Sequence, residues 1–198
     1  MRVRGPVTLA SQNPGKLEEL TELAHGALDL RLLPREPAPP VVEEDQGTYA
    51  GNALVKARAI AAFTGGAALA DDSGLEVDAL GGAPGVRSAR YGGPGLDDAG
   101  RCARLLRELA GTERRSARFR CVLALVQGDD WVVGEGTLEG EITRAPRGTG
   151  GFGYDPVFLV AALGRTLAEV APEEKNRISH RARAMQALLG KLSGVAAR

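Results

Sequence analysis

The chain has 198 residues, of which 43% are hydrophobic, so it is long enough and apolar enough to bury a substantial core. Its 25 basic and 25 acidic residues cancel at pH 7, so its bulk charge predicts no nucleic-acid partner and no anionic membrane partner. Because no apolar run reaches the length of a signal peptide or a membrane span, we expect a cytoplasmic protein whose residues 1–198 form a single domain.

Apolar runs and helical patterns alternate in the first half of the chain. The predicted elements are helices at 16–24 and 48–63, a proline-rich loop at 34–40, and strands at 7–10, 28–33 and 67–70. Strands that alternate with helices are typical of an α/β protein in which at least part of the sheet is parallel. A further helix at 97–109 starts with acidic residues and ends before Gly111, as helices commonly do.

The second half begins with the pattern of a β-hairpin. Residues 118–127 alternate between polar and apolar side chains, 128–130 form a turn sequence, and 131–143 suit an antiparallel partner strand. One last helix is predicted, with Pro172 in its first turn. Its apolar stripe consists of Ile178, Ala182, Met185, Leu189 and Leu192.

Lysine is scarce, since only four of the 25 basic residues are lysines, and Lys16 has the most unusual position. It follows a polar turn that contains Ser11 and Asn13, and it opens the next predicted helix. A cation there opposes the helix dipole unless an anion such as phosphate occupies the helix N-terminus. The turn is not an ATPase phosphate loop, because Ala10 and Leu17 replace its glycine and its Ser or Thr. An exposed lysine that tolerates a small energetic cost is the simpler alternative.

Two adjacent carboxylates, Asp71 and Asp72, follow the predicted strand 67–70, at the strand end where open α/β sheets bind ligands. Because side chains alternate along an extended chain, we expect one of the two to face a site and the other to point into the structure. A third carboxylate from the acidic segment 43–45 could complete an oxygen-ligand site for Mg²⁺. An Asp-rich turn without a ligand is an equally simple interpretation.

Residues 148–153 match the G-x-G-x-x-G pattern of dinucleotide-binding loops, but that pattern requires a following helix. Residues 154–158 indicate an extended segment instead, so we reject a dinucleotide site. The glycines would let a flat ring approach the backbone, with Phe152 or Tyr154 as a stacking face. A core or turn role for these two aromatic side chains is equally compatible with the sequence.

His180 and Arg181 fall in the last predicted helix but cannot share a face, because adjacent residues are about 100° apart on an ideal helix. Either a ligand meets the helix end-on, or the helix effectively begins near Ser179 as its N-cap. For His180 alone, an exposed surface histidine is the simpler interpretation.

Four motifs occur along the chain. They are Ser11-x-Asn13-x-x-Lys16, the block from Ala70-Asp71-Asp72-Ser73-Gly74 to Ser88-Ala89-Arg90-Tyr91, Phe152-Gly153-Tyr154-Asp155-Pro156-x-Phe158, and Glu174-Lys175-Asn176-x-Ile178-Ser179-His180-Arg181. In this order they resemble the inosine triphosphate pyrophosphatase family, which removes non-standard purine nucleotides. The resemblance implies an elongated, two-lobed α/β fold with a long central mixed β-sheet flanked by helices, and a homodimer. It also implies Mg²⁺-dependent hydrolysis of ITP, dITP or XTP to the monophosphate and pyrophosphate.

The same resemblance implies roles for individual residues. The triphosphate would be held by Ser11, Asn13, Lys16 and Lys56. Asp72 would be the general base and a Mg²⁺ ligand, and Glu44 would complete the metal site. Contacts to the nucleoside and base are implied for Ser73, Phe152, Gly153, Tyr154, Asp155, Lys175, His180 and Arg181. The chain departs from the family pattern at Gly51, Arg101 and Cys102.

Two other functions remain as alternatives. A catalytically silent purine-nucleotide binding protein would be expected to lack a carboxylate at position 72 or 44, whereas both are present. A septum-inhibition-type nucleotide pyrophosphatase with another base specificity should lack the His180-Arg181 ending. For the favoured activity, donors aimed at a 6-keto oxygen would reject adenine, whereas guanine shares that oxygen and must be excluded through its 2-amino group. We expect Arg181 to act on base preference and Lys16 to act on all triphosphates alike.

Overall fold

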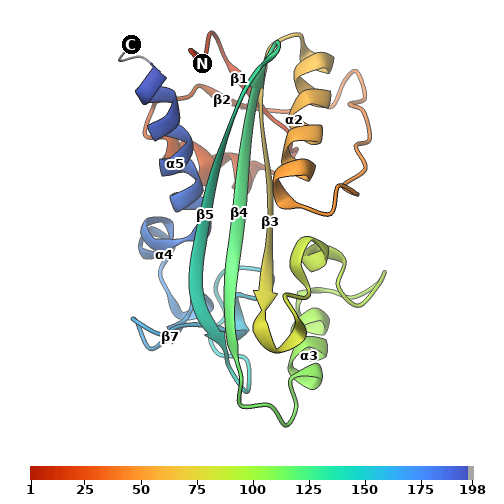
Figure 1. Cartoon of the computed structure of the whole chain (residues 1–198), viewed down its shortest axis with the longest axis vertical. Coiled ribbons are helices and arrows are strands. Elements are labelled where there is room, and N and C mark those ends of the chain that lie inside the picture. The colour runs from red at the N-terminus through yellow and green to blue at the C-terminus, as the bar shows by residue number, and fades with distance from the viewer. Residues whose placement is uncertain (196–198) are drawn as a thin grey trace. The chain divides into compact units, whose positions relative to one another are not determined.

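A computed structural model of the chain describes residues 1–195. Within them, a seven-stranded mixed sheet has the order β2-β1-β3-β4-β5-β6-β7 and is flanked by helices, which confirms the predicted α/β class (Figure 1). The strands are β1 (Val7–Leu9), β2 (Leu30–Leu32), β3 (Ala67–Val77), β4 (Ser116–Gln127), β5 (Asp130–Ile142), β6 (Phe158–Val160) and β7 (Arg165–Thr166). The helices are α1 (Pro14–Ala24), α2 (Tyr49–Thr64), α3 (Asp98–Glu108), α4 (Pro172–Ile178) and α5 (His180–Val195). No helix in this described part is long and apolar enough to cross a lipid bilayer.

The chain divides into two compact units that interleave in sequence. The first unit contains residues 1–72, 121–136 and the chain from 180 onward, and the second contains 73–120 and 137–179. Strands β3, β4 and β5 each contribute residues to both units. Each unit has its own cluster of buried hydrophobic side chains.

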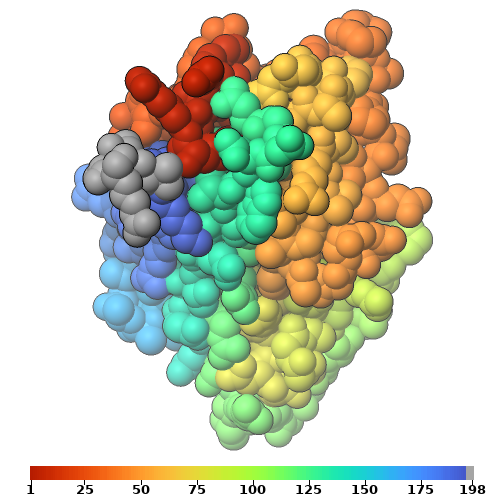
Figure 2. All heavy atoms as spheres, turned by 45° about the horizontal axis from the view of Figure 1, so that its top comes forward, coloured from red at the N-terminus to blue at the C-terminus, as the bar shows by residue number. Residues whose placement is uncertain are grey.

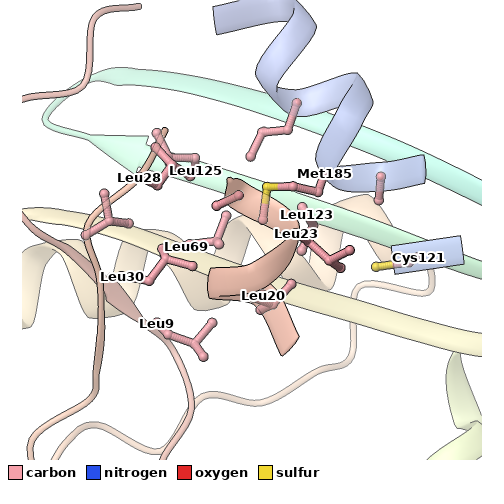
Figure 3. Close-up of a cluster of buried hydrophobic side chains, with 14 of the residues drawn as sticks. Leu9, Leu20, Leu23, Leu28, Leu30, Leu69, Cys121, Leu123, Leu125 and Met185 are labelled. Carbon is pink, nitrogen blue, oxygen red and sulfur yellow. The ribbon is translucent and has the colours of Figure 1, made fainter. Parts of the chain in front are cut away.

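In the first unit, β1 pairs in parallel with both β2 and β3, so that Val7 lies opposite Leu30 and Ala67. Helices α1 and α5 pack against each other, and their buried side chains meet those of the strands (Figure 3). The core includes Leu9, Leu20, Leu69, Leu123, Leu125 and Met185, all completely buried. In this unit β4 is buried at every position from 121 to 126, as expected for a strand covered on both faces.

The tip of the β4–β5 hairpin lies at the surface between the N-terminal segment and α2 (Figure 2). Gln127 holds the N-terminal segment, because its Nε2 donates to the carbonyl of Arg4 at 2.8 Å and its Oε1 accepts from the Arg4 N–H at 3.0 Å. A groove between the tip and α2 is lined by Arg58, Ala61, Ala62, Gly65, Gly66, Val126, Gln127, Gly128 and Asp129. None of these is a predicted site residue, so the groove is not the candidate site.

In the second unit, β6 pairs antiparallel with both β5 and β7. Phe119 and Phe158 meet in its core with their ring centroids 4.6 Å apart. The predicted extended segment at 154–158 is wrong in its first part, because residues 155–157 form a 3₁₀ turn and the strand begins only at Phe158. The turn forms because the N–H of Phe158 donates to the carbonyl of Asp155.

Strand β3 is longer than predicted, since it runs from Ala67 to Val77 and includes Asp71 and Asp72. Asp has a low preference for strands, which is why the sequence suggested an earlier end. The neighbouring parallel strand β1 ends at Leu9, opposite Leu69. Both carboxylates therefore lie just beyond the carboxyl end of β1, although β3 itself continues.

Two helices replace the single last helix predicted from Pro172. Helix α4 ends at Ile178, Ser179 adopts an extended conformation with φ −64° and ψ 157°, and α5 starts at His180. The break confirms the second of the two sequence alternatives, a helix start near Ser179. It places His180 and Arg181 in the first turn of α5.

Candidate functional site

The turn before α1 is fixed by its own side chains. Asn13 is the N-cap, and its Oδ1 accepts hydrogen bonds from the backbone N–H groups of Gly15 at 2.9 Å and Lys16 at 3.3 Å. The Oγ of Ser11 accepts from the backbone N–H of Asn13 at 3.1 Å. Helix α1 therefore begins at Pro14, two residues before the predicted start. Because the side-chain oxygens of Ser11 and Asn13 accept hydrogen bonds within the turn, the hydroxyl O–H of Ser11 and the side-chain N–H groups of Asn13 are the donors suited to an anion.

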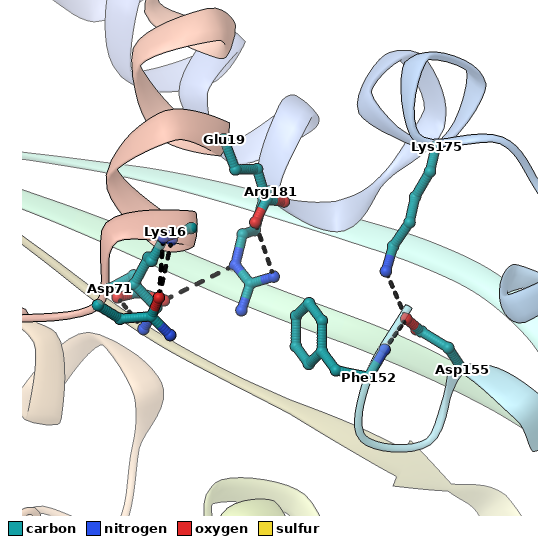
Figure 4. A network of polar contacts seen from close by, with 9 residues as sticks. Lys16, Glu19, Asp71, Phe152, Asp155, Lys175 and Arg181 are labelled. Atoms are coloured by element: carbon teal, nitrogen blue, oxygen red, sulfur yellow. Dashed lines mark hydrogen bonds and ion pairs between the residues drawn. The ribbon is translucent and has the colours of Figure 1, made fainter. Parts of the chain in front are cut away.

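Lys16 points at Asp71, and the same carboxylate also faces Arg181 (Figure 4). The Nζ of Lys16 lies 2.8 Å from Oδ1 of Asp71, and Nε of Arg181 lies 3.8 Å from its Oδ2. Glu19 is a second acid beside Arg181, with 3.3 Å between Oε2 and Nη1. Burial by itself raises the pKa of Asp71, but the charges of Lys16 and Arg181 outweigh it and lower the pKa from 3.8 to about 2. Asp71 is therefore a permanent carboxylate at neutral pH.

Asp72 bonds to α2 instead. Its Oδ2 accepts a hydrogen bond from Nδ2 of Asn52 at 2.9 Å, and Oδ1 of Asn52 accepts from the backbone N–H of Gln46 at 3.0 Å. Burial raises the pKa of Asp72 above its usual 3.8, the Asn52 hydrogen bond opposes this rise, and the negative charge of Glu44 adds to it. The net increase makes Asp72 a better proton acceptor than an exposed aspartate.

Glu44 and Lys56 form an ion pair in which Nζ lies 2.6 Å from Oε1. Lys56 lies four residues after Asn52 on α2, so the two side chains share one face of that helix. Through these two side chains α2 holds Asp72 and the segment that carries Glu44. Within residues 1–195, no cluster of three or more His, Cys, Asp and Glu side chains is arranged to hold a metal ion.

His180 and Arg181 are each only 5% exposed, so the interpretation of His180 as a surface residue is wrong. The cause is a close approach of α5 to β5 at two glycines. A Cβ atom on Gly136 would lie 2.1 Å from the carbonyl oxygen of His180, and one on Gly134 would lie 2.3 Å from that of Ala184. Only glycine permits such contact between backbones, which fixes how deeply the first turn of α5 is set.

The second unit contains a separate polar group. The carboxylate of Asp155 accepts a hydrogen bond from the backbone N–H of Phe152 at 2.9 Å and forms a short ion pair with Lys175 (Figure 4). The ammonium of Lys175 also lies 4.7 Å from the centroid of the Phe152 ring, within the range of a cation–π contact. Because Phe152 is 56% exposed, its ring offers a flat apolar surface.

The other predicted base-binding residues of this unit have different surroundings. Tyr154 is buried, and its hydroxyl donates to the carbonyl of Ser88 at 2.9 Å. Gly153 has a left-handed backbone with φ +61°, and its N–H donates to Oδ2 of Asp98 at 2.7 Å. Ser73 is half-buried in β3. Of the two aromatic residues, Phe152 and not Tyr154 is therefore the one with an exposed ring.

Gly51, one of the departures from the family pattern, has a local explanation. A Cβ atom there would lie 2.7 Å from Cβ of Gln46 and 2.9 Å from Oγ1 of Thr48, the N-cap of α2. A larger residue would have to displace the segment that leads into α2. Arg101, a second departure, pairs with Asp98 at 2.6 Å on the surface of α3.

Asn52 and Glu19 were not predicted as site residues, yet each contacts one that was. Asn52 is completely buried, and its signal is a lone amide in an alanine-rich helix four residues before Lys56. Glu19 follows Lys16 by three residues, on the same side of α1. Its partner Arg181 is 162 positions away, and no local pattern connects the two.

The comparisons with known proteins agree with one another. A family model described as the Ham1 family matches residues 7–191. A protein of Geobacillus kaustophilus named dITP/XTP pyrophosphatase is 50% identical over 186 residues, which cover 92% of this chain and 91% of the relative. A protein of the same name from Ralstonia nicotianae is 50% identical over 194 residues, covering 94% of this chain and 96% of the relative. The structure of a HAM1 protein from Coxiella burnetii has a TM-score of 0.88 at 45% identity, and covers 96% of this chain and 100% of that chain.

Proposed function

The chain belongs to the Ham1 family, and we propose that it hydrolyses the non-standard purine nucleoside triphosphates ITP, dITP and XTP to the monophosphate and pyrophosphate. Relatives named dITP/XTP pyrophosphatase, half identical over nearly the whole chain, support this activity. The observation in the structure that carries the proposal is Asp72, a buried carboxylate with a raised pKa that is oriented by Asn52. Such a group is suited to accept a proton from water.

Mg²⁺ is the proposed cofactor, and the donors of the first unit fit it. Mg²⁺ prefers oxygen ligands and is commonly held by one or two carboxylates together with substrate phosphates. Asp72 and Glu44 offer such carboxylates, and the charge of Glu44 already acts on Asp72. Lys56, the present partner of Glu44, would then be shared with the phosphates. When bound, the ion would neutralise phosphate charge.

In the proposed reaction, Asp72 takes a proton from a water molecule whose oxygen bonds to the α-phosphorus. The bond between the α-phosphorus and the oxygen that bridges to the β-phosphate breaks, and pyrophosphate leaves with that oxygen. Lys16 and Lys56 stabilise the negative charge of the phosphates, while Ser11 and Asn13 donate hydrogen bonds to them. The first products are therefore a nucleoside monophosphate and pyrophosphate.

Recognition of the nucleoside and base is proposed for Ser73, Phe152, Gly153, Tyr154, Asp155, Lys175, His180 and Arg181. The exposed ring of Phe152 supports a stacking role, since it is backed by the cation of Lys175. The planar guanidinium of Arg181 suits the edge of a base. Because the hydroxyl of Tyr154 is bonded to the protein interior, its contribution would come from its backbone.

We also propose that the protein acts as a homodimer in the cytoplasm, where the nucleotide pool is located, and folds as one domain. Light scattering at micromolar concentration would measure the oligomeric state. A single unfolding transition that coincides in fluorescence and circular dichroism would support folding as one domain.

A panel of nucleotides tests the activity. The eight common nucleoside triphosphates, ITP, dITP and XTP are each incubated with the protein and Mg²⁺, with and without inorganic pyrophosphatase. Orthophosphate should appear only when pyrophosphatase is present, with kcat/KM for the three non-standard purines at least about tenfold higher than for the others. Asp72→Asn, prepared identically, controls for contaminating hydrolases.

The panel also separates the alternatives. Binding of ITP without turnover would favour a silent purine-nucleotide binding protein. Turnover that is highest on the pyrimidine nucleotides of the panel would favour a septum-inhibition-type pyrophosphatase.

A further inference from the structure

Asp71 is the common partner of two cations that belong to different helices. Lys16 comes from the first turn of α1 and contacts Oδ1 at 2.8 Å, whereas Arg181 comes from the first turn of α5 and faces Oδ2 at 3.8 Å (Figure 4). The Asp71 side chain is only 4% exposed and that of Arg181 only 6%. Water therefore screens this arrangement much less than it would an ion pair at the surface.

The two contacts depend on each other because they use one carboxyl group. Each oxygen has its own cation, so a rotation of the carboxylate that improves one contact changes the other. If Lys16 turns away, Asp71 keeps its ion pair with Arg181 and loses the one with Lys16. Arg181 is also tied to α1 through Glu19, at 3.3 Å, so its position depends on the helix that carries Lys16.

Asp72 does not take part in this arrangement, because its carboxylate bonds to Asn52. The two consecutive acids therefore have different tasks. Asp72 is the proposed proton acceptor, whereas Asp71 forms ion pairs with Lys16 and Arg181, both of which are proposed to meet the nucleotide.

We infer that Asp71 is a positioning residue that couples phosphate binding to base recognition, by holding the ammonium of Lys16 and the guanidinium of Arg181 on one carboxylate. The inference rests on the proposed function for the roles of Lys16 and Arg181. A bound phosphate group attracts the ammonium of Lys16 and weakens its contact with Asp71. The carboxylate of Asp71 then interacts more strongly with Arg181, so the guanidinium takes a different position when a triphosphate is bound. This coupling replaces the sequence-based expectation that Lys16 affects all triphosphates alike.

The test measures kcat/KM for ITP and GTP in wild type, Asp71→Asn, Lys16→Ala, Arg181→Ala and the two double variants that contain Asp71→Asn. Asparagine keeps the shape of Asp71 but removes its charge. We expect Asp71→Asn to lower kcat/KM for ITP about tenfold or more and the ITP/GTP ratio at least about threefold. Its effect on the ratio should disappear in the Arg181→Ala background, because the group through which it acts is then missing. If the fold-changes in kcat/KM of the single variants simply multiply in both double variants, the inference is overturned.

Lys16→Ala provides a second route if Asp71→Asn does not fold. Coupling through Asp71 requires Lys16→Ala to change the ITP/GTP ratio by at least about threefold, whereas separate sites require an unchanged ratio. Asp78→Asn is the matched control, since it removes an acid that pairs with Arg118 at 2.9 Å and is not a proposed site residue. This control should leave the ratio as in wild type.

A measurement without nucleotide separates this inference from the proposed function. In ¹⁵N-labelled protein, the chemical shift of the Arg181 Nε–H group should change when Lys16→Ala is introduced into the wild type. It should not change when Lys16→Ala is introduced into the Asp71→Asn variant. A shift of equal size in both backgrounds would show that Asp71 does not transmit the change. Failure of the wild type to hydrolyse ITP would instead count against the proposed function and leave this result intact.

Discussion

Asp71 and Asp72 are neighbours in β3, yet their carboxylates bond to different helices, the first to Lys16 on α1 and the second to Asn52 on α2. Alternation along the strand produces this division, since successive side chains point to opposite faces of a sheet. The consequence is that two adjacent acids differ in acidity. Cations hold the pKa of Asp71 at about 2, while burial raises the pKa of Asp72.

Replacement of Asp72 should abolish most of the turnover. Asp72→Asn keeps the size of the side chain but cannot accept a proton, so kcat for ITP should fall by roughly 10²–10⁴. The pyrophosphatase-coupled assay measures the rate, and circular dichroism checks the fold. Asp129→Asn, at the surface of the β4–β5 turn, is the control and should retain full activity. Wild-type turnover by a folded Asp72→Asn protein would remove Asp72 from the mechanism.

The hydrogen bond from Asn52 should set the acidic limb of the pH profile. This bond lowers the pKa of Asp72, so its loss in Asn52→Ala must raise that pKa. Because the base works only when deprotonated, the acidic limb of kcat/KM should move to higher pH than in wild type. A limb that stays in place, or moves to lower pH, would mean that another group is titrating.

Asn52→Ala should also lower stability, for a separate reason. Asn52 is completely buried and satisfies both Asp72 and the backbone N–H of Gln46. Leaving the buried carboxylate of Asp72 without this partner costs about 1–3 kcal/mol. The midpoint of urea unfolding should therefore decrease, with an unchanged m-value.

The charged carboxylate of Asp71 should stabilise the fold, and this stabilisation should be lost at acidic pH. Its folded pKa of about 2 lies below the ordinary 3.8, so its contribution is complete above pH 3.8 and disappears as the pH falls through 2. The difference corresponds to roughly 2 kcal/mol. Urea unfolding gives the difference in unfolding free energy between wild type and Asp71→Asn. This difference should be roughly 2 kcal/mol larger at pH 5 than at pH 2. A difference that is the same at both pH values would contradict the contribution of this carboxylate.

The sequence predicted those parts of the site that depend on neighbouring residues. The polar turn before α1, the opposite directions of the Asp71 and Asp72 side chains, and a helix start near Ser179 all follow from local rules for turns, strands and helix ends. The length of β3 did not, because two aspartates in a strand are tolerated only when each has a partner from elsewhere in the chain. For Asp71 those partners are Lys16 and Arg181, which no local pattern relates to it.

The products distinguish the proposed cleavage from other triphosphate chemistry. Attack at the α-phosphorus releases pyrophosphate, so IMP and pyrophosphate should be the first products from ITP. Ion-exchange chromatography of a reaction stopped early, without added pyrophosphatase, separates IMP from IDP. The appearance of IDP with orthophosphate would place the attack at the γ-phosphorus and refute the assignment of the leaving group.

A methyl group on β5 should alter base preference from a distance. In Gly136→Ala the new Cβ would lie 2.1 Å from the carbonyl oxygen of His180 and 2.3 Å from the backbone nitrogen of Ala184. Both neighbours are backbone atoms, so α5 itself must move, and overpacking of this kind typically costs about 1–3 kcal/mol. Because His180 and Arg181 move with the helix, the ITP/GTP ratio of kcat/KM should decrease along with stability.

Gly190→Ala, on the same helix, is the matched control, since no heavy atom lies within 4 Å of the position of its new Cβ atom. That variant should keep the wild-type ratio and be no less stable, given the higher helix propensity of alanine. If Gly136→Ala lost stability but kept the wild-type ratio, the depth of α5 would not govern base preference.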